Sequence, residues 1–140
     1  MKSKSLVAAQ FGLLLLIILI GETGDDALTE MCVLFGLFIG IWAVATMKFK
    51  VSIIPDVRED QEFITTGPYK YVRHPMYSSI LAIALGFVIG SDSLLILVLA
   101  ILLLIVLLKK IDHEEKLLKK HFKNYEKEFK NTKRLIPFIY

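Results

Sequence analysis

The chain has 140 residues, of which 55% are hydrophobic and 22% are charged, and its mean hydropathy is +0.60. This composition excludes an ordinary soluble domain, and the length predicts one domain built from membrane helices. The net charge of +3 is unevenly distributed and follows the predicted membrane boundary rather than a nucleic-acid surface, and the single Cys32 excludes an intramolecular disulfide and a cysteine-based metal site.

Four apolar runs predict an all-α integral membrane protein with about four transmembrane helices. The runs are Leu6–Ile20, Ala27–Met47, Met76–Gly90 and Leu94–Leu108. A helix needs roughly 20 residues to cross the hydrocarbon core, so the second run is long enough. The third and fourth runs are short and need flanking residues, a thinner bilayer or packing as a helical hairpin. No cleavage site follows the first run, which we therefore expect to be retained.

The basic residues predict the orientation of these helices. All 17 lysines and arginines fall in three places: the first four residues, the loop 48–73, and the segment from Lys109 onward. In the other two connections between the apolar runs, the only charged residues are acidic. With four spans, the three basic places lie on one side of the membrane, and the positive-inside rule predicts that this side is cytoplasmic. Both termini and the long loop are therefore expected in the cytoplasm.

The segment Asp112–Lys133 predicts a cytoplasmic amphipathic helix. Leu118, Phe122, Tyr125 and Phe129 recur at helical spacing, and the opposite face is rich in lysine. Such a helix would lie well on an anionic membrane surface. We expect the last seven residues, an apolar tail, to dock back on the protein or on the membrane interface.

The stretch Thr65–Tyr77 gathers three tyrosines, an arginine, a histidine and two prolines at the edge of the third apolar run. Gly67-Pro68 predicts a turn, and Pro75 suits the first turn of a helix. Arg73 and His74 would then lie where a membrane helix meets water, beside free backbone N–H groups that form a natural anion site. A simple interfacial anchor of aromatic and basic residues would explain the same composition.

A second polar cluster follows the fourth apolar run. Glu114 and Glu115 come less than two helical turns after it, and Lys110 and Glu114 are one above the other at i,i+4 spacing. These residues could form an ordinary ion pair, or they could project toward Arg73 and His74. The three histidines show no metal-like spacing, so we predict no metal site. No nucleotide-binding glycine motif is present, so a soluble-type nucleotide fold is not supported.

Both clusters match parts of a known signature in the same order. Residues 66–77 read TGPYKYVRHPMY, and the second part begins with EEKLL at 114–118, continues with three aromatic residues, and ends with KRLIPF at 133–138. In these motifs the chain resembles the isoprenylcysteine carboxyl methyltransferase family, integral membrane enzymes that use S-adenosylmethionine (SAM). The resemblance covers roughly Ile53–Phe138.

The resemblance implies a single domain, residues 1–140, with an N-terminal helical hairpin at 5–47 and a catalytic core at about 48–140. The chain is shorter than the eukaryotic enzymes and has fewer spans, which suggests a minimal core that a homodimer could complete. The glycine that usually follows the phenylalanine of the second motif is Lys123 here, and the spacing to Tyr125 is one residue short.

The resemblance also implies roles for single residues. Ten residues are implied to bind SAM. Four of them form a loop that helps to close over it, namely Gln61, Glu62, Phe63 and Ile64. The others are Tyr69, His74, Pro75, Met76, Tyr77 and Glu114. Lys110 occupies the place of an arginine that faces the substrate carboxylate, and it lacks the bidentate fork of arginine. We predict Lys110 and Arg73 as the catalytic residues, where Arg73 could hold the carboxylate of SAM or order the loop that does.

The implied function is SAM-dependent methyl transfer to a lipophilic acceptor in the membrane, such as the carboxylate of an isoprenylated cysteine. A carboxylate is ionised at neutral pH, so alignment in a dry pocket would be sufficient and no general base is required. A small thiol or a phospholipid amine is an alternative acceptor.

Two other classes of function stay open. One is an NADPH-dependent membrane sterol or enone reductase, which shares a similar Arg-His-Pro-x-Tyr segment. The phosphates of NADPH would need more arginine partners than the three in this chain, and Glu114-Glu115 would repel them. The other is a non-enzymatic membrane scaffold whose lysine-rich tail binds anionic lipid.

Overall fold

The structure is a computed structural model that describes residues 2–48 and 64–140. The helices in this part of the chain are α1 (Lys2–Ile20), α2 (Ala27–Thr46), the 3-10 helix η1 (Gly67–Lys70), α3 (Pro75–Ser91), α4 (Leu94–His121) and α5 (Tyr125–Glu128). Within the described residues the only β-type pairing is one isolated parallel bridge between Val72 and Lys133. The predicted all-α fold is therefore confirmed.

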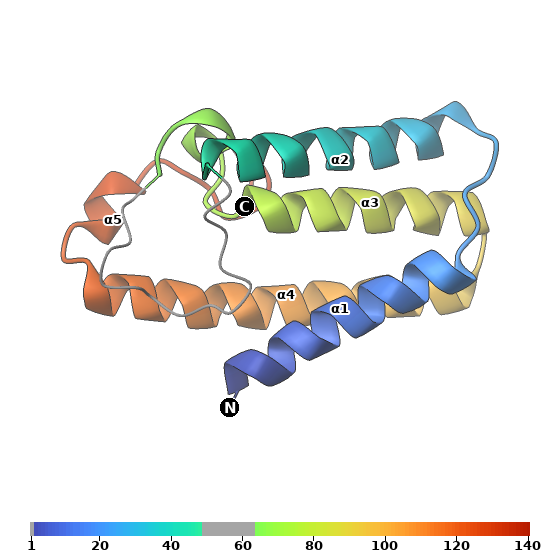
Figure 1. The fold of residues 1–140 in the computed structure, drawn as a ribbon, viewed down its shortest axis with the longest axis horizontal. Coiled ribbons are helices and arrows are strands. Elements are labelled where there is room, and N and C mark those ends of the chain that lie inside the picture. The colour runs from blue at the N-terminus through green and yellow to red at the C-terminus, as the bar shows by residue number, and fades with distance from the viewer. Residues whose placement is uncertain (1, 49–63) are drawn as a thin grey trace.

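The four long helices are arranged as two antiparallel pairs. Helix α2 packs mainly on α3, and α1 packs mainly on α4, which it crosses at an angle (Figure 1). The start of α1, the end of α2, the start of α3 and the end of α4 all lie at one end of the bundle (Figure 1). We call this end, where the lysine-rich segments gather, the basic end. The presence of the lysine-rich segments at one end agrees with the charge pattern of the sequence. That this end faces the cytoplasm stays a prediction.

Three helices are long and apolar enough to cross a membrane, namely α1 from Ser3 onward, α2 and α4. Helix α3 is apolar but has 17 residues, whereas α4 has 28 and extends beyond its apolar part. Large apolar side chains such as Leu19 and Leu34 are exposed on the outside of the bundle. Lipid can cover such side chains. The length of the apolar helices and the apolar outer surface of the bundle therefore both indicate an integral membrane protein.

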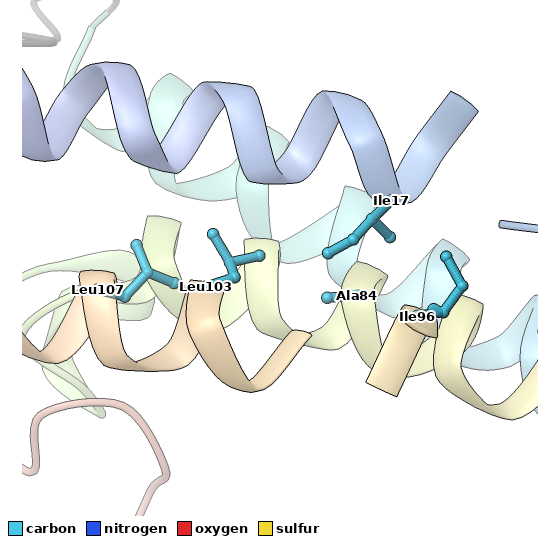
Figure 2. Packing of buried hydrophobic residues seen from close by; sticks show 5 residues of the cluster. All are labelled: Ile17, Ala84, Ile96, Leu103 and Leu107. Atoms are coloured by element: carbon cyan, nitrogen blue, oxygen red, sulfur yellow. The ribbon is translucent and has the colours of Figure 1, made fainter. Parts of the chain in front are cut away.

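The buried core lies between α1, α3 and α4. Figure 2 shows its centre, where Ile17 of α1 and Ala84 of α3 approach Ile96, Leu103 and Leu107 of α4. These side chains are almost completely buried. Since lipid tails are as apolar as leucine, close packing rather than transfer out of water holds the helices together here.

Helices α2 and α3 approach each other through small residues. Gly36 is buried, and a Cβ atom on it would lie 2.8 Å from the carbonyl oxygen of Ser79 and 3.0 Å from the backbone nitrogen of Ile83. The hydroxyl of Ser79 donates a hydrogen bond to the carbonyl of Gly36 at 2.6 Å. Only a residue without a side chain allows this contact, which fixes α3 against α2.

We expect Gly36→Ala to destabilise the protein by about 1–3 kcal/mol, because the added methyl group overlaps backbone atoms that cannot rotate away. The measurement is the thermal-unfolding midpoint of the purified protein in detergent. The matched control is Gly12→Ala on α1, where an added Cβ would meet no atom within 4 Å. Equal midpoints for the two variants would contradict the close helix contact.

The C-terminal segment differs from the amphipathic helix expected over Asp112–Lys133. Helix α4 continues without a break to His121, and Phe122 then takes an extended conformation with φ −114° and ψ 110°. Only the single turn of α5 follows before the chain returns to the start of α3. The physical reason is that residues beyond α5 exchange helical hydrogen bonds for backbone pairing with the residues just before α3, as in the bond from the Arg73 N–H to the Lys133 carbonyl at 2.7 Å.

Candidate active site

The two polar clusters of the sequence meet at the basic end. Pro75 is the first residue of α3, as its fixed φ and missing N–H favour. His74 precedes it with φ −126° and ψ 61°, and its side chain makes no capping bond to the helix. The imidazole instead reaches the carboxylates of Glu114 and Glu115 on α4.

Glu114 of α4 faces the first turn of α3. The hydroxyl of Tyr77 donates a hydrogen bond to Oε1 of Glu114, and Oε2 of Glu114 lies 3.6 Å from Nδ1 of His74. The rings of His74 and Tyr77 stack with centroids 5.6 Å apart. The side chain of Glu114 is 19% exposed, so the carboxylate is ordered by two partners and still accessible to a third.

Tyr69 lies in η1 beside this group. Gly67 at the start of η1 has φ +59°, and a Cβ on it would lie 2.5 Å from Oγ1 of Thr46, so η1 can rest this closely on the end of α2 only with glycine. Tyr69 is half-buried. Burial, and then the charge of Glu114, raise the pKa of Tyr69 to about 12, so its phenol stays neutral at physiological pH.

Lys110 enters the same cluster from α4 but not as the expected ion pair. Its ammonium donates a hydrogen bond to Oε1 of Gln10 at 2.7 Å, and it lies 4.9 Å from the centre of the Tyr77 ring. Among the described residues no ion pair joins Lys110 to Glu114. Sequence reasoning did not predict the role of Gln10, whose only signal is that it is the one polar side chain within the first apolar run.

Glu115 forms a buried ionic centre next to Glu114. It is 2% exposed, and its Oε1 accepts a hydrogen bond from Nη1 of Arg73 at 3.2 Å and lies 3.3 Å from Nε2 of His74. Its Oε2 accepts from Nη2 of Arg134 at 3.0 Å. The carboxylate thus joins α4, the start of α3 and the C-terminal segment. The sequence motif indicated Glu115 only as the neighbour of Glu114.

Arg73 is engaged mainly with the C-terminal segment. Its Nε donates to the carbonyl of Thr132 at 2.9 Å, and its Nη2 donates to the carbonyl of Phe129 at 2.9 Å. Together with the bond to Glu115, all three guanidinium nitrogens are used. Its assignment as a catalytic residue stays a prediction, and this geometry favours the role of ordering a loop over that of holding an anion.

The backbone N–H groups before α3 are also occupied. Those of Arg73 and His74 donate to the carbonyls of Lys133 at 2.7 Å and Arg134 at 3.1 Å. The N–H groups of Arg73 and His74 are therefore not available to bind an anion, because the C-terminal segment pairs with them. In the first turn of α3, the N–H of Tyr77 donates to the carbonyl of His74 at 3.0 Å. The anion site expected beside Arg73 and His74 stays a prediction. The hydroxyl of Ser78 also donates to this C-terminal segment, to the carbonyl of Leu135 at 2.6 Å.

The other residues predicted to bind SAM have different positions. Pro75 is buried and Met76 is half-buried in the first turn of α3, beside His74. Ile64 is half-buried and begins the segment that leads to η1. Gln61, Glu62 and Phe63 lie outside the described residues, so their assignment stays a prediction.

Comparison with known proteins adds one finding. The model of a family described as phospholipid methyltransferase matches residues 26–125, which include α2, α3, α4 and the polar residues His74, Tyr77 and Glu114. No curated protein matches the chain, and no solved structure matches it.

Proposed function

The chain belongs to the phospholipid methyltransferase family, and on that premise we propose that it transfers a methyl group from SAM to a lipophilic acceptor in the membrane. The family match covers the first motif and the beginning of the second, and it supports a membrane methyltransferase. The observation that carries the proposal is the group formed by His74, Tyr77 and Glu114. These side chains come from segments that are 37 residues or more apart and meet at the end of the bundle.

The side chains at this site fit the chemistry of SAM, whose ammonium and sulfonium groups carry positive charge. Glu114 is a partly exposed carboxylate that could pair with the ammonium of SAM. The ring of Tyr69 could lie against the sulfonium, a contact worth about 0.5–2 kcal/mol. The Tyr77 ring is already in contact with Lys110 and His74, so it is the less suitable of the two. When bound, SAM supplies an electrophilic methyl group.

An acceptor with a carboxylate is supported by Lys110. Its ammonium is buried beside Tyr77, next to the residues proposed to hold SAM. A carboxylate with a pKa near 3.5 is already ionised at neutral pH, so the protein has only to align it and exclude water. On this hypothesis Lys110 holds the acceptor and Glu114 holds the donor, about one helical turn apart on α4.

A phospholipid amine is the second candidate acceptor, because the matched family is described by phospholipid methylation. An ammonium group must lose a proton before its nitrogen can be methylated. Tyr77, Glu114 and His74 form a connected chain of polar contacts that could accept that proton. A small thiol would need the same help.

The reductase alternative receives less support. NADPH carries several phosphate groups, for which arginine is the preferred partner. Arg73 and Arg134 are both bonded to Glu115, and Arg58 lies outside the described residues.

We expect SAM to raise the thermal-unfolding midpoint of the protein in detergent and NADPH to leave it unchanged. A ligand at 100 times its Kd stabilises by about 2.7 kcal/mol, which such a measurement detects. Transfer is then measured with methyl-labelled SAM and two acceptors, an N-acetyl-S-prenylcysteine and phosphatidylethanolamine. Mild alkali releases the label from a methyl ester and leaves it on a methylated amine. Stabilisation by NADPH without any response to SAM would overturn the proposal.

A further inference from the structure

Helix α1 contributes a side chain to the candidate site although it lies outside the matched residues 26–125. Ser3, Gln10 and Ile17 are buried and spaced by seven residues, so they share the face of α1 that packs on α4. Gln10 is 3% exposed, and its carbonyl oxygen is the group that accepts the hydrogen bond from Lys110. The first helix is therefore more than a membrane anchor.

The position of the Lys110 ammonium depends on Gln10. Lys110 is 3% exposed, and Gln10 is the only hydrogen-bond acceptor that the described residues offer to its ammonium. The Tyr77 ring adds a cation–π contact at 4.9 Å, and Glu114 lies one turn further along α4. A buried cation near a membrane is costly without such partners, and a free lysine side chain would extend toward the aqueous boundary instead.

We propose that Gln10 is a positioning residue, which holds the Lys110 ammonium beside Tyr77 so that it can bind an anionic oxygen group of the acceptor. The group is a carboxylate or a lipid phosphate. This inference rests on the proposed function and adds α1 to it. Because the amide of Gln10 is neutral, it orders the ammonium without cancelling its charge. Two N–H donors of Lys110 then remain for the acceptor.

The test compares Gln10→Leu with wild type in steady-state methyl transfer to the N-acetyl-S-prenylcysteine and to phosphatidylethanolamine. We expect the KM of an acceptor that binds through Lys110 to rise about 10-fold or more, because the variant loses a hydrogen bond to a charged group. The Kd of SAM should stay within about twofold, since Glu114 keeps both partners. The acceptor whose KM rises identifies the anionic group as carboxylate or phosphate.

Three further variants separate positioning from a loss of folding. Gln10→Glu keeps an acceptor for the Lys110 ammonium but adds a negative charge beside it. It should therefore keep the wild-type midpoint while the KM rises, because the new carboxylate competes with the anionic group of the acceptor. The pair Gln10→Leu with Lys110→Met replaces both partners by apolar side chains, so it should recover the midpoint lost in Gln10→Leu but not the KM. Ser3→Ala is the matched control on the same face of α1. The Ser3 hydroxyl is buried and has no hydrogen-bond partner within the described residues, so its removal should leave the KM unchanged and should not lower the midpoint.

The inference is overturned if Gln10→Leu changes the KM of neither acceptor while wild type binds SAM and transfers methyl groups. It is also overturned if Gln10→Leu and Lys110→Met have additive effects on KM, because residues that act through one another are not independent. Failure of the proposed function is a different result, in which wild type neither binds SAM nor methylates either acceptor.

Discussion

A Glu114→Gln variant should bind SAM about 10- to 100-fold more weakly than the wild-type protein, because a hydrogen bond to a charged partner is worth about 1.5–3 kcal/mol. Glutamine has nearly the size of glutamate and can still accept a hydrogen bond from the Tyr77 hydroxyl. The variant therefore removes the charge proposed for the ammonium of SAM and leaves the packing of α3 on α4 in place. Isothermal titration in detergent measures the affinity directly.

Glu114 gives a cleaner test than His74. The imidazole of His74 lies near both Glu114 and Glu115, so a loss of affinity after its replacement could come from the ligand site or from the ionic centre behind it. The control is Glu128→Gln, which removes the same charge from an exposed position on α5. If Glu114→Gln and Glu128→Gln bind SAM as tightly as the wild type, the proposed donor site is wrong.

The apolar runs were sufficient to predict where the four long helices lie, because the part of a helix that crosses a membrane must be apolar. They did not predict that α4 continues beyond Leu108 to His121. The predicted run Ala27–Met47 and helix α2 differ by a single residue at one end. Lysine distribution then predicted that both polar clusters lie at the same end. These two inferences explain why the sequence predicts that His74 and Glu114 meet.

The partners inside the cluster could not be predicted in the same way. Helix α1 is apolar on nearly all sides between Leu6 and Ile20, so hydropathy does not show that Gln10 lies opposite Lys110. Likewise, Glu114 and Glu115 are adjacent and chemically identical, and only the packing of α4 directs one toward Tyr77 and the other toward Arg73. The sequence does not indicate which partners a long and flexible side chain will contact.

The C-terminal segment shows the opposite case, in which a strong local pattern was overridden. Phe122, Tyr125 and Phe129 have helical spacing, yet the regular helix ends before them. Tyr125 and Phe129 are still buried, with ring centroids 4.9 Å apart, so the apolar stripe was interpreted correctly and its backbone was not. The hydrogen bonds of the C-terminal segment to Arg73 and His74 join residues far apart in the sequence, and local periodicity does not indicate such contacts.

We expect Glu115→Gln to lower the free energy of unfolding by about 3 kcal/mol, because breaking a buried ion pair leaves charge without a partner. Arg73 and Arg134 would both lose their bond to a carboxylate whose side chain is 3% exposed. The C-terminal segment should then detach more often from α3. The measurements are the thermal-unfolding midpoint in detergent and the rate of tryptic cleavage after Lys130 and Lys133.

An exposed ion pair provides the matched control for this prediction. Lys119 and Glu126 are 3.1 Å apart, nearly the same distance as Arg134 and Glu115, but their side chains are 44% and 78% exposed. Water already screens such a pair, which contributes about 0–1 kcal/mol, so Glu126→Gln should change stability little. Similar effects of the two substitutions would mean that burial does not strengthen the centre at Glu115. The C-terminal segment would then be held mainly by its backbone bonds to Arg73 and His74.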